Sequence, residues 1–236
     1  MDDRLAAAYD MVPPCGICAD IGADHGKLSA ALLGEGKAGH MLVSDISEKA
    51  LAKARKLLGY LRLADRATFA VADGLQGLSA LKGQAVEAVC ILGMGGDTIG
   101  GVLLEGKERL CGATLILGAQ TELPAVRNAL CAIGYRLREE RIAEASGRYY
   151  LLMKATPALA GEAAYTKQEL LLGPCLLQTL PAQWRPVLER REQLLETAEA
   201  ALEQSSSERS EARLAEVKRE LAYVRGALAV LAQEKT

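Results

Sequence analysis

The chain has 236 residues, with 28 Lys and Arg against 30 Asp and Glu, so its formal net charge is −2. Hydrophobic residues make up 50% and charged residues 25%, a composition that excludes a disordered or collagen-like chain. The balanced charge argues against a strongly basic nucleic-acid-binding protein but permits RNA binding through local basic patches. Aromatic residues are only 4%, so a broad base-stacking platform is not expected.

The amino terminus, Met-Asp-Asp-Arg, starts acidic and shows no signal-peptide pattern, and no apolar run reaches the roughly 20 residues of a membrane-spanning helix. Most of the six cysteines lie in apolar stretches, as buried cysteines do in a reducing compartment. Cys15 and Cys18 form a Cys-x-x-Cys pair, but no second ligand pair or redox motif accompanies it. We therefore expect a cytoplasmic protein without a membrane segment.

Up to residue 155, short apolar runs alternate with amphipathic segments. An opening helix is predicted at residues 3–11, and strands are predicted at 17–21, 41–45, 67–72, 86–92 and 113–117. Helices are predicted at 26–33, at 48–63, from near Asp97 and at 123–133. Two final strands, 136–143 and 148–155, are joined at Ser146-Gly147. This order predicts an α/β fold with a mainly parallel, Rossmann-like sheet and an antiparallel edge.

The chain changes character after an Ala-rich linker at residues 156–165. Apolar residues recur at coiled-coil spacing on both sides of Ser205-Ser206-Ser207, namely Leu188, Leu195 and Leu202, then Leu214, Val217, Leu221, Val224, Leu228 and Leu231. Two such helices joined by a polar turn predict an antiparallel helical hairpin. We expect a first domain at residues 1–157 and a hairpin domain at 166–236, which either packs on its own domain or docks a partner or RNA.

The most informative segment is the turn from Ala19 to Leu28, which follows an apolar strand and opens a helix. Doubly wound sheets bind nucleotide-like ligands at such a turn. A dinucleotide fingerprint would need glycine at positions 24 and 27, where this chain has Asp24 and Lys27. Asp20 and Asp24 would also repel a pyrophosphate from the helix amino terminus, and a P-loop motif is missing from this turn.

An acidic turn suits a cationic ligand without phosphates, and S-adenosylmethionine carries a sulfonium and an ammonium group. Asp20-x-Gly22-x-x-x-Gly26 has the spacing of a methyltransferase glycine loop. Gly22 and Gly26 are expected to let the backbone approach the methionine part of this donor. Asp20, at the end of the strand, is expected to hold its ammonium group directly or through water. The alternative is a plain strand-to-helix turn whose glycines serve only its geometry.

Two further carboxylates follow the next two strands. Asp45 lies about 20 residues past the glycine loop, where an acid commonly binds ribose hydroxyls. Asp73 is placed to accept a hydrogen bond from the adenine amino group. The alternatives are a helix cap for Asp45, in competition with Ser47, and a simple turn residue for Asp73, which precedes Gly74. Three acids at consecutive strand ends form a more specific pattern than any one of them.

These residues together resemble the bacterial family of tRNA (adenine-22-N1)-methyltransferases. The matching segments are residues 20–26, Asp45-Ile46, Asp73-Gly74-Leu75 and Gly93-Met94-Gly95-Gly96. The resemblance implies a class I methyltransferase fold, S-adenosylmethionine as donor and tRNA as acceptor, with Ile46, Gly74, Gly93 and Met94 joining the donor site. The glycines at 93–96 have a tight helix-capping turn as their alternative. Gly118-Ala119-Gln120 and Ser29 depart from the family pattern, which affects the expected base pocket more than donor binding.

On this interpretation Asp24 stabilises the positive charge that develops on the methylated adenine, and His25 orients the base or Asp24. Asp24 has a helix cap as its alternative role. Adenine N1 has a free lone pair but lies on the pairing edge, so the nucleotide must be unpaired or flipped. His25 and His40 are the only histidines, too few for a metal cluster, so no metal is expected.

The expected partner is tRNA, and the protein is expected to be a monomer. Local basic clusters could supply RNA contacts, although such clusters are usually solvated surface. They are Lys53, Arg55, Lys56, Arg62 and Arg66; Arg136, Arg138, Arg141 and Arg148; and Arg190 and Arg191. In the helical hairpin, which is acidic overall, individual residues such as Arg190, Arg191, Lys218 and Arg219 are the expected RNA contacts. Two other functions stay open from sequence. One is a methyltransferase that acts on a small molecule or a protein, and the other is a catalytically inactive fold that serves as an interaction module.

Overall fold

The structure of the chain is a computed structural model that describes residues 2–204 and 207–233. The chain folds into two compact units, Met1–Ala163 and Ala164–Thr236. Two of the serines expected to break the C-terminal helix, 205 and 206, lie outside the described residues.

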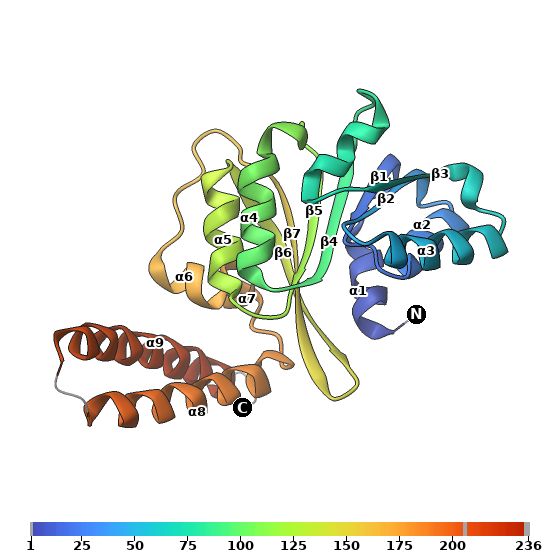
Figure 1. Cartoon of the computed structure of the whole chain (residues 1–236). Helices are drawn as coiled ribbons and strands as arrows, with labels where there is room; N and C mark the ends of the chain where they lie inside the picture. Colours follow the sequence, from blue (N-terminus) through green and yellow to red (C-terminus); the bar gives the residue numbers. More distant parts are fainter. Residues whose placement is uncertain (1, 205–206, 234–236) are drawn as a thin grey trace. The chain divides into compact units, whose positions relative to one another are not determined.

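The first unit is built on a seven-stranded sheet with the order β3-β2-β1-β4-β5-β7-β6 (Figure 1). Its strands are β1 (Cys15–Ile21), β2 (Ala38–Asp45), β3 (Ala67–Val71), β4 (Ala88–Met94), β5 (Thr114–Ala119), β6 (Tyr135–Ala145) and β7 (Arg148–Pro157). β1 to β5 are parallel, whereas β7 runs antiparallel between β5 and β6. The predicted parallel sheet with an antiparallel edge is therefore confirmed.

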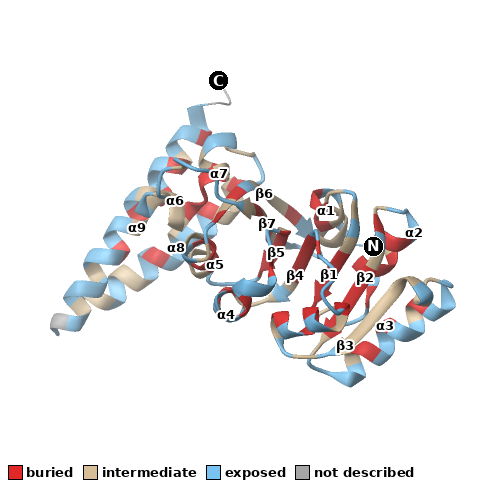
Figure 2. Cartoon of the chain, turned by 90° about the horizontal axis from the view of Figure 1, so that it is seen from above, coloured by how far each residue is buried: buried red, intermediate tan, exposed pale blue. Residues whose placement is uncertain are grey.

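Helices cover both faces of this sheet. α1 (Asp3–Met11), α2 (Lys27–Gly34) and α3 (Glu48–Tyr60) share one apolar core, whereas α4 (Gly96–Gly106) and α5 (Leu123–Ala132) pack together (Figure 1). The central strands are buried because both of their faces are covered, as the red ribbons of β1, β4 and β5 show in Figure 2. This arrangement leaves the carboxyl ends of β1 to β5 together at one edge of the sheet.

Several boundaries differ from the sequence prediction for local reasons. α3 ends at Tyr60 rather than at residue 63, because Arg62 adopts a positive φ of 58° and the Leu63 amide turns back to the Leu58 carbonyl at 2.8 Å. β4 starts and ends two residues later than predicted, since its pairing with β1 begins at Ala88. The 3₁₀ helix η2 (Gly74–Leu81) was not predicted at all.

The second unit contains α6 (Lys167–Leu172), α7 (Pro174–Thr179), α8 (Trp184–Glu203) and α9 (Glu208–Gln233). α8 and α9 form the predicted antiparallel hairpin. Interhelical ion pairs give its direction: Arg225 of α9 reaches Glu192 and Glu196, whereas the earlier residue Lys218 reaches the later acid Glu203. The seam buries Leu188 and Leu195 of α8 and four residues of α9: Val217, Leu221, Val224 and Leu231. Leu202, Leu214 and Leu228 of the predicted seam are only partly buried.

Candidate active site

A cavity of about 320 Å³ opens where β1, β2 and β4 end. The structure brings seven predicted site residues to its lining. Four are titratable: Asp20, Asp24, His25 and Asp45. The others are Gly22, Gly93 and Met94. Arg4 and Leu5 of α1 and Lys27 of α2 also line it, although no motif or spacing in the sequence marks them as site residues. We call this space the edge cavity.

Asp20 is the buried acid of the edge cavity. It is 4% exposed, and the Ser29 hydroxyl donates a hydrogen bond to its Oδ2 at 2.7 Å. Burial raises the pKa of Asp20 to about 6, the hydrogen bonds from Ser29 oppose this rise, and the charge of Asp45 adds to it. A carboxylate that folding holds in a low-dielectric pocket is stabilised by a cation, so Asp20 favours a positively charged ligand.

Asp45 joins the ends of two strands. Its Oδ1 accepts a hydrogen bond from the Ser47 amide at 2.8 Å, and its Oδ2 accepts one from the Asp24 amide at 3.3 Å. Ser47 itself caps α3 by accepting from the Ala50 amide. The capping role considered for Asp45 therefore falls to Ser47, and Asp45 instead orders the turn that carries Asp24.

Asp24, His25 and Lys53 form a hydrogen-bonded chain at the mouth of the edge cavity. His25 Nδ1 contacts Asp24 Oδ2, and Lys53 Nζ donates to His25 Nε2 at 3.2 Å. Because an ammonium group can only donate, Nε2 is the acceptor and the proton of the neutral ring lies on Nδ1, facing Asp24. The residue at the N-cap of α2 is Gly26, with no side-chain cap bond, so Asp24 does not take the capping role considered for it.

Lys53 was not predicted to belong to the site. It lies on α3, 28 residues from His25, among several lysines and arginines of the same helix. Only the packing of α3 beside the glycine turn brings it to the imidazole, and nothing in its local sequence distinguishes it from Lys49 or Lys56.

The two glycines of the turn have different surroundings. Gly22 has a positive φ of 71°, and a Cβ there would lie 2.1 Å from the Met94 Cε, so the Met94 side chain packs directly against Gly22 where both residues line the edge cavity. Gly26, with φ of 66°, faces α3 instead, where a Cβ would lie 2.8 Å from the Ala54 Cβ. Gly26 thus permits close packing of α3 against the turn, and it does not line the edge cavity.

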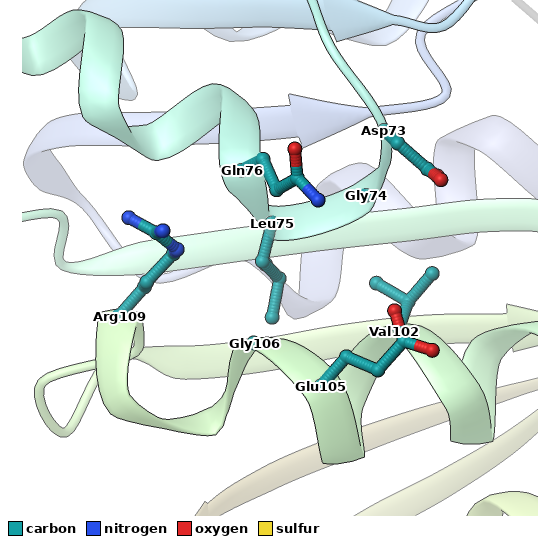
Figure 3. Close-up of a pocket in the computed structure, with 8 residues that line it drawn as sticks. All are labelled: Asp73, Gly74, Leu75, Gln76, Val102, Glu105, Gly106 and Arg109. Atoms are coloured by element: carbon teal, nitrogen blue, oxygen red, sulfur yellow. The ribbon is translucent and has the colours of Figure 1, made fainter.

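Asp73 and Gly74 lie outside the edge cavity. They line a separate cavity of about 140 Å³ between η2 and α4, together with Val102, Glu105 and Arg109 (Figure 3). Asp73 precedes η2 without a side-chain cap bond. Ile46, after Asp45, is 71% exposed and lines neither cavity. The acids at the ends of β1 and β2 therefore share one cavity, whereas the acid after β3 does not.

The cysteines are surrounded by apolar packing. Cys18 and Cys90 are fully buried, with their sulfur atoms 3.9 Å apart. A hydrogen bond with Cys18 and partial burial raise the pKa of the Cys15 thiol, which disfavours the reactive thiolate. Across residues 2–204 and 207–233, no three His, Cys, Asp or Glu side chains gather in a way that could hold a metal ion. None of the helices in the same ranges has the length and apolar character of a membrane span.

The sequence profile of the Methyltransferase domain family matches residues 1–153. The tRNA (adenine(22)-N(1))-methyltransferase of Bacillus subtilis (strain 168) is 29% identical over 205 residues, 83% of this chain and 84% of that protein. The crystal structure of the B. subtilis m1A22 tRNA methyltransferase TrmK has a TM-score of 0.87 at 23% identity and covers 97% of this chain and 98% of that chain. The structure of M. capricolum TrmK in complex with S-adenosyl-homocysteine has a TM-score of 0.84 at 20% identity, over 98% of this chain and 99% of that chain.

The sheet order, the glycine turn after β1 and the carboxylates at the strand ends define a Rossmann-like methyltransferase domain. The chain belongs to the Methyltransferase domain family, whose match spans nearly the whole first unit. The fold and the enzyme class predicted from the sequence are confirmed.

Proposed function

We propose that this protein transfers a methyl group from S-adenosylmethionine to N1 of adenosine 22 in bacterial tRNA. The observation that carries the proposal is the extent of the likeness to the B. subtilis tRNA methyltransferase. Its 205 aligned residues exceed the length of the first unit, so the likeness reaches into the helical unit as well as the catalytic domain. A methyltransferase domain alone would leave the acceptor open. The cytoplasm, where tRNA is found, is the proposed site of action.

The chemistry of the edge cavity supports S-adenosylmethionine as the donor. Asp20, Asp24 and Asp45 line it, and a sulfonium with an ammonium group is favoured beside carboxylates. Asp20 would hold the ammonium group, and Asp45 the ribose hydroxyls. Gly22 lets the backbone of the turn lie close to the ligand, and the Met94 side chain, which packs against Gly22, lines the same cavity. Gly26, Ile46, Asp73 and Gly74 keep their proposed donor-binding roles only if the ligand extends beyond the edge cavity.

When bound, the donor supplies a methyl carbon attached to a sulfonium leaving group. Adenine N1 has a lone pair at neutral pH, so the protein need not provide a general base. Its residues instead expose the base, align N1 and exclude water. Methylation leaves the adenine ring positively charged, and the exposed carboxylate of Asp24 is placed to stabilise that charge. His25, fixed between Asp24 and Lys53, holds this carboxylate in place.

Methyl transfer to unmodified bacterial tRNA tests the proposal. The protein is incubated with tRNA transcripts and S-adenosylmethionine, and the digested nucleosides are analysed by mass spectrometry. One methyl group per tRNA is expected, as 1-methyladenosine at position 22, and none in a matched transcript that carries guanosine at this position. Asp24→Ala should keep donor binding and lose most turnover. Donor binding without any transfer to tRNA would contradict the proposal and favour a small-molecule or protein acceptor.

A further inference from the structure

The hairpin of β6 and β7 extends beyond the rest of the sheet. β5 pairs with β7 only as far as Ala119 and Leu151, whereas β6 and β7 continue pairing up to Ala145 and Arg148. Figure 1 shows this yellow hairpin projecting past the neighbouring strands. Ser146 and Gly147 close it with positive φ angles of 52° and 70°, which suit a tight two-residue hairpin turn. We call residues 143–150 the hairpin tip.

The hairpin tip projects at the edge where the edge cavity opens. Ala119, the last paired residue of β5, lies beside Met94 of β4, and Met94 lines the edge cavity. Arg4 of α1 connects the two features. It lines the edge cavity, and its guanidinium lies 5.2 Å from the centre of the Tyr150 ring. Arg4 thus links the lining of the edge cavity directly to the hairpin tip.

The hairpin tip carries groups that suit RNA. Tyr149 is 41% exposed, a large exposure for an aromatic side chain in a chain with few of them. Arg148 is exposed, and over residues 2–204 and 207–233 no carboxylate lies within ion-pair distance of it. The neighbouring arginines of the same sequence cluster are engaged: Arg138 pairs with Glu162, and Arg141 pairs with Glu139 and Asp10.

Alternation along β7 divides these side chains between two faces. Arg148 and Tyr150 point to the face that α1 covers, the face of the buried Leu152, whereas Tyr149 and its cross-strand neighbour Glu144 point to the other. The first face is basic and aromatic. The second has one aromatic ring and one acid, so a polyanion would bind along the first face, with the ring of Tyr149 available to an adjacent unpaired base.

We propose that the hairpin tip is an RNA-contact element, on which Arg148 binds a phosphate and the exposed ring of Tyr149 stacks on an unpaired base near the methylated nucleotide. Unpaired bases stack on aromatic side chains regardless of their identity, and arginine supplies the matching phosphate contact. N1 of adenine is accessible only when the nucleotide is unpaired, so neighbouring bases lose stacking partners that an aromatic ring can replace. This inference rests on the proposed function, because it takes tRNA as the substrate.

Binding of tRNA by the full chain tests this inference separately from methyl transfer. Arg148→Ala and Tyr149→Ala are each expected to raise the Kd for tRNA about tenfold, and Tyr149→Phe should restore wild-type affinity because it keeps the ring. Arg148→Ala should also reduce the salt dependence of binding by about one phosphate contact. The donor Kd and the thermal unfolding midpoint should not change, because neither residue lines the edge cavity.

Matched controls come from other exposed residues of the same unit. Tyr60 of α3 is 85% exposed, and Lys82 follows η2; Tyr60→Ala and Lys82→Ala should leave the tRNA Kd unchanged. Ultraviolet crosslinking of bound tRNA followed by trypsin should label the peptide of residues 149–154, which contains Tyr149, and not that of residues 57–62, which contains Tyr60.

The outcomes are distinguishable. Wild-type tRNA affinity in the Arg148→Ala, Tyr149→Ala double variant, or crosslinks without residues 149–154, would overturn the role of the hairpin tip while leaving methyl transfer intact. Binding of tRNA that depends on the hairpin tip, without methylation at adenosine 22, would overturn the proposed activity alone. A wild-type chain that does not bind tRNA would overturn both.

Discussion

Asp20 illustrates how a binding residue can reduce the stability of the free protein. Folding raises the pKa of Asp20 from 3.8 to about 6, so the folded chain still holds a proton at pH values where the unfolded chain has released it. The free energy of unfolding therefore falls as the pH rises from about 4 to about 6. Above that range the ionised, buried acid destabilises the free protein by up to about 3 kcal/mol, at 1.36 kcal/mol per pKa unit.

Asp20→Asn should thus stabilise the free protein at pH 7.5 and weaken donor binding. The unfolding midpoint should rise by several degrees, since about 1 kcal/mol shifts it by about 2–4 °C in a domain of this size. The gain should shrink as the pH falls from about 6 to about 4, and it should vanish only below the unfolded-state pKa of 3.8, where Asp20 is protonated in both states. Thermal melts from pH 4 to 8 and calorimetric titration with S-adenosylmethionine measure the two effects.

Glu140→Gln is the matched control for Asp20→Asn. Glu140 is also a buried acid, but Arg127 pairs with it at 2.8 Å, with both side chains fully buried. Removal of its charge leaves the guanidinium without its counterion, so this variant should lower the unfolding midpoint. A lower midpoint for Asp20→Asn as well, or an unchanged donor affinity, would contradict the role assigned to Asp20.

Lys53 positions His25 without touching the edge cavity itself. Lys53→Met removes the donor to Nε2, so only Asp24 then favours the tautomer with the proton on Nδ1. The preference of His25 for that tautomer should weaken, and Asp24 should be held less firmly. Turnover should fall about tenfold with donor affinity unchanged. Nitrogen NMR shifts of the two histidines measure the tautomer, with His40, which pairs with Thr68 at 2.9 Å, as the internal reference.

Lys56→Met is the control for Lys53→Met. Lys56 is exposed on the same helix and does not line the edge cavity, so its substitution changes the net charge of α3 equally. If both variants lowered turnover to the same extent, with His25 unchanged in its NMR shifts, general charge rather than positioning would explain the loss.

At the level of elements, the ends of β2 and β3 make unequal contributions. Asp45 lines the edge cavity and holds two backbone amides, whereas Asp73 lines the smaller cavity beside α4. Asp45→Asn should therefore weaken donor binding about tenfold, and Asp73→Asn should weaken it less. Calorimetric titration of both variants tests this order. If both variants bound the donor with wild-type affinity, both acids would have purely structural roles.

The meeting of the acids at one edge of the sheet was predictable from the sequence. Strands that alternate with helices indicate a parallel sheet, and the carboxyl ends of parallel strands lie at the same edge. Asp20, Asp24, His25 and Asp45 therefore reached one cavity as expected. Their partners were not predictable. Lys53 lies beside His25 only because α3 packs against Gly26, and Arg4 comes from a helix whose position depends on β6 and β7.

The position of Asp73 was also not predictable, because it depends on packing between elements that are far apart in the chain. Residues 74–81 have no clear period, so the turn after Asp73 reads as a loop, yet it folds as η2. Because η2 packs against α4, Asp73 lies beside α4 and outside the edge cavity. Leu75 packs against Gly106, where a Cβ would lie 2.5 Å from the Leu75 Cβ (Figure 3). Close packing between elements far apart in the chain is the information that local sequence does not contain.

For the whole molecule, the functions of the two units can be separated by truncation. The first domain expected from the sequence ends at residue 157, but Arg138 binds Glu162 and Arg136 binds the Ala163 carbonyl beyond it. A fragment that ends at residue 163 keeps these contacts. It should fold, with a cooperative thermal transition, and it should bind S-adenosylmethionine with the affinity of the full chain, because every residue of the edge cavity precedes this point.

The same fragment should methylate tRNA with a KM raised about tenfold or more, because the helical hairpin of α8 and α9, which it lacks, would supply part of the RNA contact.

Single residues of the helical hairpin can be tested in the same way. Arg191 pairs with Glu220 and Lys218 pairs with Glu203, so these two residues stabilise the helical hairpin and do not offer free charge. Arg190 and Arg219 are exposed and, in the described part of the chain, form no ion pair, so they are the expected phosphate contacts. In the full chain, Arg190→Ala with Arg219→Ala should reproduce part of the KM increase, whereas Arg213→Ala, which removes a charge paired with Glu216, should not. A soluble fragment that binds the donor and methylates tRNA with the KM of the full chain would show that the hairpin lies outside the RNA site, and contact would then depend on the first unit alone.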